Sequence, residues 1–281
     1  MFLLIFALLS GSLSAQTYST NQYGAKAVSL AEGGRAFVSG YDSIMINPAG
    51  TSLTDEPQFG VGSSFGDYAS VSIGYVDEGG FHIFQSFKDI DNKFGVGGAQ
   101  TYAGFSYALS GLWLVGFNAG YNYFQTHKGF DVNFGIDFGP GLKSATRTGF
   151  IGAVSIRNPF QNGGHGEVSG TLGYSYKSTF SITMDNIYVF QDGVVSGLSI
   201  INQDRYDMVL ALESYPLESE EYSMTFSTRI EGFGTDNNFK VGGGLGYVGD
   251  TFKVDTGVYA TDFTRGRIRK ITFAISLIFG V

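Results

Sequence analysis

The sequence predicts an all-β protein, namely a membrane-spanning, antiparallel up-and-down β-barrel of about fourteen strands with an N-terminal plug segment in its lumen. Three observations lead to this prediction: segments in which apolar and polar residues alternate, a high content of glycine and aromatic residues, and the absence of a long apolar run. Successive side chains of a strand point to opposite faces, so each alternating segment has one apolar and one polar face. A segment of roughly ten residues is long enough for a tilted strand to cross a bilayer.

The clearest alternation lies between Trp113 and Phe138, where the pattern predicts the two strands of a hairpin. One set of positions holds large apolar residues. The positions between them hold glycine and the polar residues Asn118, Asn122, Asp131, Asn133 and Asp137. A water-soluble sandwich would also alternate, but its Asp and Asn would face water and glycine would be rarer. The pattern therefore favours a barrel with lipid outside and polar groups inside.

The composition supports this fold class and excludes others. The chain has 281 residues, including 42 Gly, 26 Phe and 17 Tyr, with no Cys and a net charge of −8. No run approaches the roughly eighteen apolar residues of a membrane-spanning helix, so a closed barrel is the remaining way to satisfy a spanning backbone. The absence of Cys excludes disulfides and thiolate metal sites. The negative charge argues against a nucleic-acid partner.

Residues 1–15 are predicted to be a signal peptide. Phe2 to Leu9 form an apolar core, and the small residues from Ser10 to Ala15 are suited to cleavage. The absence of Lys or Arg before the core is atypical, and a buried N-terminal strand is the alternative. A cleaved signal followed by barrel assembly predicts a location in the bacterial outer membrane.

Residues 16–56 do not alternate and are assigned to a plug (hatch) segment, which leaves residues 57–281 for the barrel. Two motifs lie in this segment: Gly33, Gly34, Arg35 and Phe37, and then Asn47, Pro48, Ala49 and Gly50. Pro48 disfavours helical backbone at Asn47, and an Asn side chain readily bonds its own local backbone. The second motif is therefore predicted to be a turn that redirects the chain from the lumen into the wall.

Together, the two motifs resemble the N-terminal plug of FadL-like outer-membrane proteins. That superfamily includes transporters of hydrophobic compounds and the PorV-type proteins of type IX secretion. The resemblance is sharpest between Ser29 and Gly50, and the alternating remainder of the chain agrees with it.

Fourteen alternating segments follow the plug, an even number as expected for a single-chain bacterial barrel. The predicted strands are Gln58–Phe65, Tyr68–Val76, Phe81–Phe87, Ala99–Leu109, Leu112–Phe124, Phe130–Phe138, Thr148–Ile156, Val168–Lys177, Phe180–Val189, Tyr206–Ser214, Tyr222–Ile230, Phe239–Val248, Thr251–Tyr259 and Lys270–Val281. If both ends of the barrel domain lie in the periplasm, most of the longer connections face outward, as barrels of this kind require.

Two groups of residues are candidates for function. The first is a set of polar residues predicted to face the lumen: Asn118, Asn122, Asp131, Asn133, Asp137, Arg229, Glu231, Lys240, Lys253 and Asp255. Charges of both signs favour cross-lumen pairing that holds a plug over a single-sign ion filter, although a small polar passage would use the same residues. The second is a basic cluster at the predicted outer rim, which either contacts lipopolysaccharide phosphates or forms a solvated loop: Arg265, Arg267, Arg269 and Lys270.

No catalytic, metal-binding or cofactor-binding motif is predicted. The run from Gly244 to Gly249 has the spacing of a dinucleotide-binding motif, but an alternating strand follows where a helix is required. The run that starts at Asp89 begins like a calcium loop, yet Phe94 stands where glycine is needed. The sequence therefore predicts that the chain is not an enzyme and has no cofactor.

The resemblance implies passive passage or binding of small hydrophobic compounds across the outer membrane. Two alternatives remain open: a PorV-like component that receives cargo in type IX protein secretion, and a structural outer-membrane protein without substrate. Expected partners are outer-membrane lipid and lipopolysaccharide, a hydrophobic small-molecule ligand and, under the secretion alternative, proteins of the secretion system.

Overall fold

The computed structural model describes most of the chain after the predicted signal peptide. The described residues are 24–66, 69–89, 98–124, 128–139, 148–159, 166–177, 179–190, 194–196, 199–201, 205–215, 221–232, 238–261 and 270–280. The predicted signal peptide (1–15) and the first part of the predicted plug segment lie outside these ranges, as do Arg265, Arg267 and Arg269.

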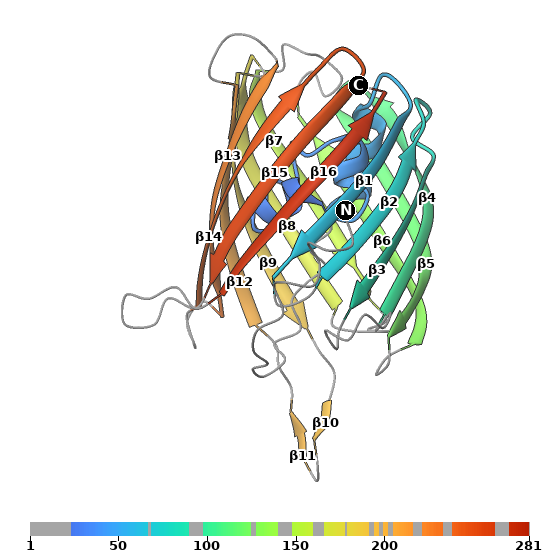
Figure 1. Cartoon of the computed structure of the whole chain (residues 1–281), viewed down its shortest axis with the longest axis vertical. Helices are drawn as coiled ribbons and strands as arrows, with labels where there is room; N and C mark the ends of the chain where they lie inside the picture. Colours follow the sequence, from blue (N-terminus) through green and yellow to red (C-terminus); the bar gives the residue numbers. More distant parts are fainter. Residues whose placement is uncertain are drawn as a thin grey trace, which may run out of the picture.

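Fourteen antiparallel strands close into one barrel, and β1 pairs with β16 to complete it (Figure 1). The strands of the barrel are β1 (Gln58–Phe65), β2 (Ala69–Val76), β3 (His82–Asp89), β4 (Gly98–Ser110), β5 (Trp113–Phe124), β6 (Lys128–Phe138), β7 (Gly149–Arg157), β8 (Gly166–Tyr176), β9 (Phe180–Phe190), β12 (Arg205–Ser214), β13 (Tyr222–Glu231), β14 (Asn238–Val248), β15 (Phe252–Thr261) and β16 (Lys270–Phe279). The predicted closed antiparallel β-barrel and all fourteen predicted strands are confirmed, with strand ends that differ by two residues at most.

One connection between strands contains structure that was not predicted. The connection between β9 and β12 contains a separate two-stranded sheet, β10 (Val194–Ser196) and β11 (Ser199–Ile201). Strands of three residues are too short to show a convincing alternation. The hairpin projects from one end of the barrel, which we call the hairpin end, and we call the opposite end, where β16 finishes, the terminal end (Figure 1).

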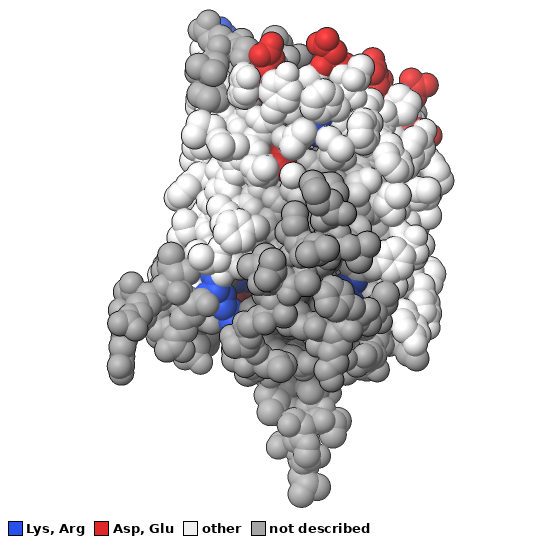
Figure 2. Space-filling model, in the orientation of Figure 1, with Lys and Arg blue, Asp and Glu red and all other residues white. Residues whose placement is uncertain are grey.

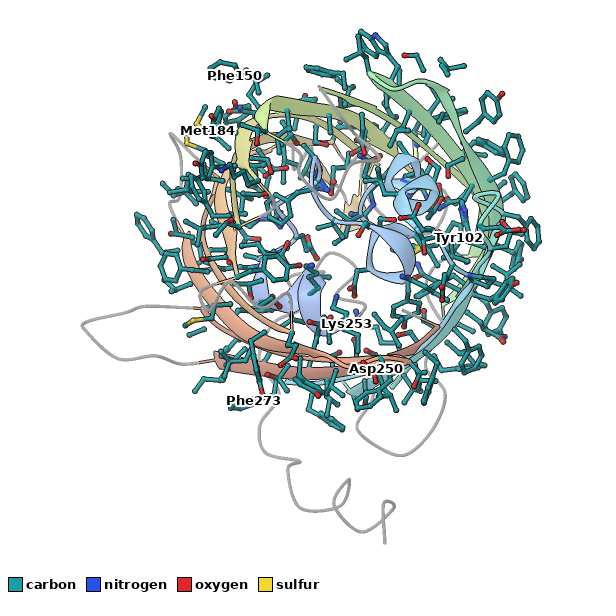
Figure 3. All side chains as sticks on the ribbon, turned by 90° about the horizontal axis from the view of Figure 1, so that it is seen from above. Tyr102, Phe150, Met184, Asp250, Lys253 and Phe273 are labelled. Carbon is teal, nitrogen blue, oxygen red and sulfur yellow. The ribbon has the colours of Figure 1, made fainter. Side chains whose placement is uncertain are left out.

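The alternation of the sequence becomes the two faces of the wall. In Figure 3, Phe150, Met184 and Phe273 point outward, whereas Tyr102 and Lys253 point into the lumen. The outward side chains are well exposed, as Phe150 is at 81% and Phe273 at 57%. Figure 2 shows acidic side chains gathered along the terminal end and a mostly uncharged face below them. A continuous apolar exterior of this kind suits contact with acyl chains.

Aromatic side chains also pair along the exterior. Phe105, Phe117 and Phe134 lie on the adjacent strands β4, β5 and β6, with ring centroids 6.2 Å and 5.1 Å apart. Such cross-strand aromatic pairs stabilise a sheet beyond the area that they bury. No helix in the described part of the chain is long and apolar enough to cross a membrane.

Residues 24–54, which we call the luminal segment, lie inside the ring of strands (Figures 1 and 3). The segment contains one turn-length helix and two 3₁₀ helices: α2 (Ala25–Ser29), η2 (Gly40–Ser43) and η3 (Pro48–Leu53). Nearly all of its residues are buried. Helices this short are not stable alone, so contacts with the wall must fix their positions.

The motif that begins at Asn47 differs from its prediction. Instead of turning directly into the wall, Asn47 caps η3, and its side-chain oxygen accepts a hydrogen bond from the Ala49 nitrogen at 3.3 Å. Pro48 fits the first helical position because the backbone N–H that it lacks would have no helical partner there. The chain then enters the wall at Gln58.

Candidate functional site

The luminal segment lies directly against inward-facing glycines of the wall, which form three glycine seats. A Cβ added to any of these glycines would overlap or press on the segment. The first seat holds the Tyr41 ring, the second holds residues 47–49, and the third holds α2. In that order, the seats are Gly60, Gly62 and Gly74; Gly116 and Gly135; and Gly242, Gly244 and Gly257. The high glycine content of the chain thus serves close approach of two backbones.

Tyr41 is the side chain that fills the first seat. Its hydroxyl is 2.9 Å from the Ser72 Oγ, and its backbone nitrogen donates to the Gln58 Oε1 at 3.1 Å. The ring also packs near Phe84, with centroids 6.3 Å apart. Burial raises the pKa of the Tyr41 hydroxyl, which therefore stays protonated.

Amide side chains of the β5–β6 hairpin hold the second seat. Asn118 Nδ2 donates to the Ile44 carbonyl at 2.7 Å, and Asn133 Nδ2 donates to the Asn118 Oδ1 at 2.6 Å. The Asn47 amide donates to Asp137 and, at 3.0 Å, to the Arg35 carbonyl. Asn118 and Asp137 therefore connect the wall to the segment, and Asn133 supports Asn118.

The other two luminal residues of the hairpin gather around a tyrosine. The Tyr102 hydroxyl lies 2.6 Å from the Asp131 Oδ2 and 2.8 Å from the Asn122 Oδ1, which share its single proton as acceptors. All three side chains are buried. They form a hydrogen-bonded group on β4, β5 and β6.

Arg229 on β13 is the centre of a buried charged cluster. Its Nη1 donates to the Glu32 Oε2 at 2.8 Å and to the Ala31 carbonyl at 3.2 Å. Its Nη2 lies 2.7 Å from the Asp207 Oδ2. Nearby, the Lys240 Nζ is 2.7 Å from the Glu231 Oε1. Arg229, Glu231 and Lys240, which were predicted to face the lumen, thus lie close together. Arg229 connects them to the luminal segment by its ion pair with Glu32.

Residues 31–35 form a tight turn that the wall holds through charged groups. Ala31 and Glu32 have φ angles of 49° and 64°, a left-handed conformation that costs about 1–2 kcal/mol per residue in non-glycine positions. Asp185 of β9 accepts from the Gly34 nitrogen at 2.9 Å and from the Arg35 nitrogen at 3.3 Å. The Arg35 guanidinium forms an ion pair with Glu167 of β8. Together with those of Arg229 on β13, these contacts from β8 and β9 offset the strain of the turn.

A second charged cluster lies nearer the terminal end. The Lys26 Nζ is 2.6 Å from the Glu213 Oε1, and the Lys253 Nζ is 3.2 Å from Asp42 and 2.7 Å from Asp255. Burial alone would lower the pKa of Lys26, but Glu213, Tyr215 and Asp255 together outweigh it, and the pKa is raised. Burial raises the pKa of the Asp42 carboxyl in spite of the neighbouring ammonium groups. The structure therefore places both Lys253 and Asp255 beside the luminal segment.

The sequence did not single out the partners of these residues: Lys26, Glu32, Asp42, Glu167, Asp185, Asp207 and Glu213. Asp185 and Asp207 occupy inward positions of alternating strands, so the pattern could have identified their face. Which groups meet across a lumen depends on barrel closure and on the path of the segment, and neither has a local signal. Of the predicted rim cluster, Lys270 pairs with Thr261 at the hairpin end of β15 and β16.

Within the described ranges, no group of His, Cys, Asp or Glu residues has an arrangement that could hold a metal ion. The run from Gly244 to Gly249, with its dinucleotide-like spacing, lies in β14 and the turn after it.

Solved structures share this fold over nearly the whole chain. The TodX deltaS2S3 mutant monoaromatic hydrocarbon channel has a TM-score of 0.65 at 8% identity, with 94% of this chain and 99% of that chain covered. The Ralstonia pickettii toluene transporter TbuX has a TM-score of 0.64 at 11% identity, with 94% and 100% covered. The CymD monoaromatic hydrocarbon channel has a TM-score of 0.63 at 13% identity, with 92% and 97% covered.

No protein-family model matches the chain, and no curated protein matches it in sequence. Identities this low show likeness of fold alone. At that level, the resemblance drawn from the sequence is confirmed: the chain has the fold of the FadL-like outer-membrane β-barrels.

Proposed function

We propose that the chain is an outer-membrane channel for small hydrophobic compounds, and that the luminal segment is the plug that closes it. The observation that carries the proposal is the shared closed barrel, which covers 94% of this chain and all of the toluene transporter TbuX. The titles of the similar structures name monoaromatic hydrocarbons and toluene. Small monoaromatic compounds are therefore the substrate class to test first.

The position of the luminal segment supports its role as a plug. Helix α2 contacts β13 to β16 and β1, η2 contacts β1 and β2, and η3 contacts β4 to β6. The turn at residues 31–35 bonds to β8, β9 and β13. Since the segment meets the wall on all these sides, passage through the lumen requires part of it to move.

The orientation and the rim contacts belong to the same proposal. We place the terminal end in the periplasm and the hairpin end outside the cell, so that the basic cluster that ends at Lys270 faces outward. There, its guanidinium and ammonium groups would bind lipopolysaccharide phosphates. The PorV-like alternative is supported by the motif resemblance, whereas the channel proposal also has the fold of known channels behind it.

Uptake measurements test the proposed function. The chain is expressed in an outer-membrane host that lacks hydrocarbon channels, and uptake of radiolabelled toluene is compared with that of a small sugar. Toluene uptake should rise above that of empty-vector cells, while sugar uptake stays unchanged. A heat-dependent shift on gels verifies that the barrel has folded. Folded protein without any gain in toluene uptake contradicts the proposal, and periplasmic accumulation of secreted proteins after deletion of the gene would favour the secretion alternative.

A further inference from the structure

The inner wall carries two aliphatic patches among its polar groups, the first on β9 and β12 and the second on β7. The first patch, Ile187, Val189 and Val209, packs against Ala31 of the luminal segment. The second, Ile151 and Ala153, packs against Ala36 and Phe37. All five wall side chains are almost fully buried. They face the lumen, where a hydrophobic compound would find apolar contacts.

The patches follow one another along the barrel. Val189 is next to the last residue of β9, at the hairpin end, whereas Ile151 is near the start of β7, at the terminal end. Asp185 lies between the patches, because it is paired with Val209 on one side and, through Thr171, is in register with Ala153 on the other. A compound that moves from one patch to the other must therefore pass Asp185.

Residues 31–37, which we call the cover, lie over both patches and over Asp185. Ala31 covers the first patch, Ala36 and Phe37 cover the second, and the nitrogens of Gly34 and Arg35 donate to Asp185 between them. Two cover residues have left-handed backbone, and two glycines follow or adjoin them. The cover is therefore held by side chains of the wall. Its backbone has the freedom to rearrange when those contacts break.

The parts of the luminal segment on either side of the cover are also held by wall side chains, such as Glu213 and Asn118, but they have a further kind of contact that the cover lacks. Helix α2 lies on the third glycine seat, where its backbone meets Gly242, Gly244 and Gly257. Residues 41–49 lie on the first and second seats. Since these contacts join backbone or a rigid ring to bare glycine, they offer no side chain that could swing away. Both flanks are therefore expected to stay in place.

We propose that the hydrophobic passenger binds along the two aliphatic patches of β7, β9 and β12, and that only the cover moves aside to admit it. This inference rests on the proposed function above. It assigns the passage to one side of the lumen, with Ile151, Ala153, Ile187, Val189 and Val209 as its lining. It also makes Asp185, which binds the cover between the patches, the gating residue.

Disulfide staples test this inference, because the chain has no native Cys. The double variant A36C/A153C joins the cover to β7 within one packed cluster. The matched control A25C/A274C joins α2 to β16 within another cluster. Cross-linking is verified by mass after alkylation, and A31C/V209C replaces the first pair if that pair does not close. Uptake of radiolabelled toluene is measured before and after reduction with dithiothreitol.

The staple on the cover should lower toluene uptake to that of empty-vector cells, and reduction should restore it. The staple on α2 should leave uptake unchanged. A block by both staples overturns the inference, since the whole segment would then have to move. Unchanged uptake with both staples also overturns it, since the passage would then lie elsewhere. Absence of uptake by the unmodified parent contradicts the proposed function itself, and the inference with it.

Discussion

The two halves of the inner wall hold the luminal segment with different chemistry. Strands β1 to β6 hold it mainly through neutral hydrogen bonds, at Tyr41–Ser72, Asn118–Ile44 and Thr51–Ser106. Strands β8 to β13 hold it mainly through charges, at Arg35–Glu167, Arg229–Glu32 and Lys26–Glu213. We call these the neutral half and the charged half.

This difference between neutral and charged contacts indicates which half of the wall can release the luminal segment. A neutral hydrogen bond gains about 0.5–1.5 kcal/mol, and little of that depends on salt or pH. A buried ion pair has a large desolvation cost, so its net contribution is small while both partners stay, but loss of one partner is strongly destabilising. The charged half can therefore be switched by a change at a single group, whereas the neutral half acts as a constant anchor.

The largest effect is expected in the charged half, for Arg229→Met. The substitution removes the Arg229 guanidinium from the buried Glu32 and leaves Asp207 paired with Arg205 alone, which should lower the free energy of unfolding by about 3–5 kcal/mol. Urea unfolding in detergent micelles measures the change. The control is Ser227→Ala on the same strand, which removes one bond to the Ser29 carbonyl and should cost about 0.5–1.5 kcal/mol. Equal losses of unfolding free energy in the two variants would contradict the proposed difference between charged and neutral contacts.

A smaller effect is expected for Gly116→Ala in the neutral half. The added methyl group would overlap Pro48 and the Ala49 nitrogen, so the segment must shift, at a cost of about 1–3 kcal/mol. The matched control is Gly170→Ala on β8, where nothing lies within 4 Å of an added Cβ. Protease accessibility of the luminal segment should rise in the first variant and not in the second. The same accessibility in both would contradict the glycine seats.

Tyr41→Phe should have a still smaller effect. The ring stays in its seat, and only the bond to Ser72 is lost, which should lower the free energy of unfolding by about 1 kcal/mol. This cost should be the same at low and high salt, because both partners are neutral. Urea midpoints at two salt concentrations check this. A cost that shrinks as salt is added would show that the neutral half also depends on charge.

Much of the fold could be predicted from the sequence because its signals are local. Alternation over Trp113–Phe124 and Lys128–Phe138 gives strand position and face together, and the faces agree with the burial of Asn118 and Asp137 and the exposure of Phe134. Barrel closure follows because a sheet that spans a bilayer cannot leave the backbone groups of its edge strands unpaired.

The site could be predicted only in part. The pattern placed Arg229 and Lys253 on the luminal face, but not beside Glu32 and Asp42, because these contacts join residues about two hundred positions apart. The sequence of the luminal segment has no periodicity from which its path could be predicted. Its position depends on where the wall lacks a Cβ, and a chain with 42 glycines gives no local sign of which ones form a seat.

The smallest expected effect concerns pH at Asp42. Burial raises the pKa of this carboxyl in the folded protein above its unfolded value, although Lys253 lies 3.2 Å away. An acid with a raised folded pKa contributes stability below its unfolded pKa of about 3.9 and loses it as the pH rises through the folded value. Asp42→Asn removes this titration. The difference in unfolding free energy, native minus variant, should therefore fall as the pH is raised from acid toward neutral.

Urea unfolding of both proteins across that pH range measures the difference. Tyr41→Phe is the control from the neutral half, because its hydroxyl does not titrate there and its cost should stay constant. A native-minus-variant difference that grows with pH would mean that the Lys253 ammonium outweighs burial and that Asp42 is held ionised. In that case the contact between Lys253 and Asp42 would be a permanent ion pair. The charged half and this ion pair would then hold α2 and η2 in place, and only the contacts of the charged half with the cover could be released.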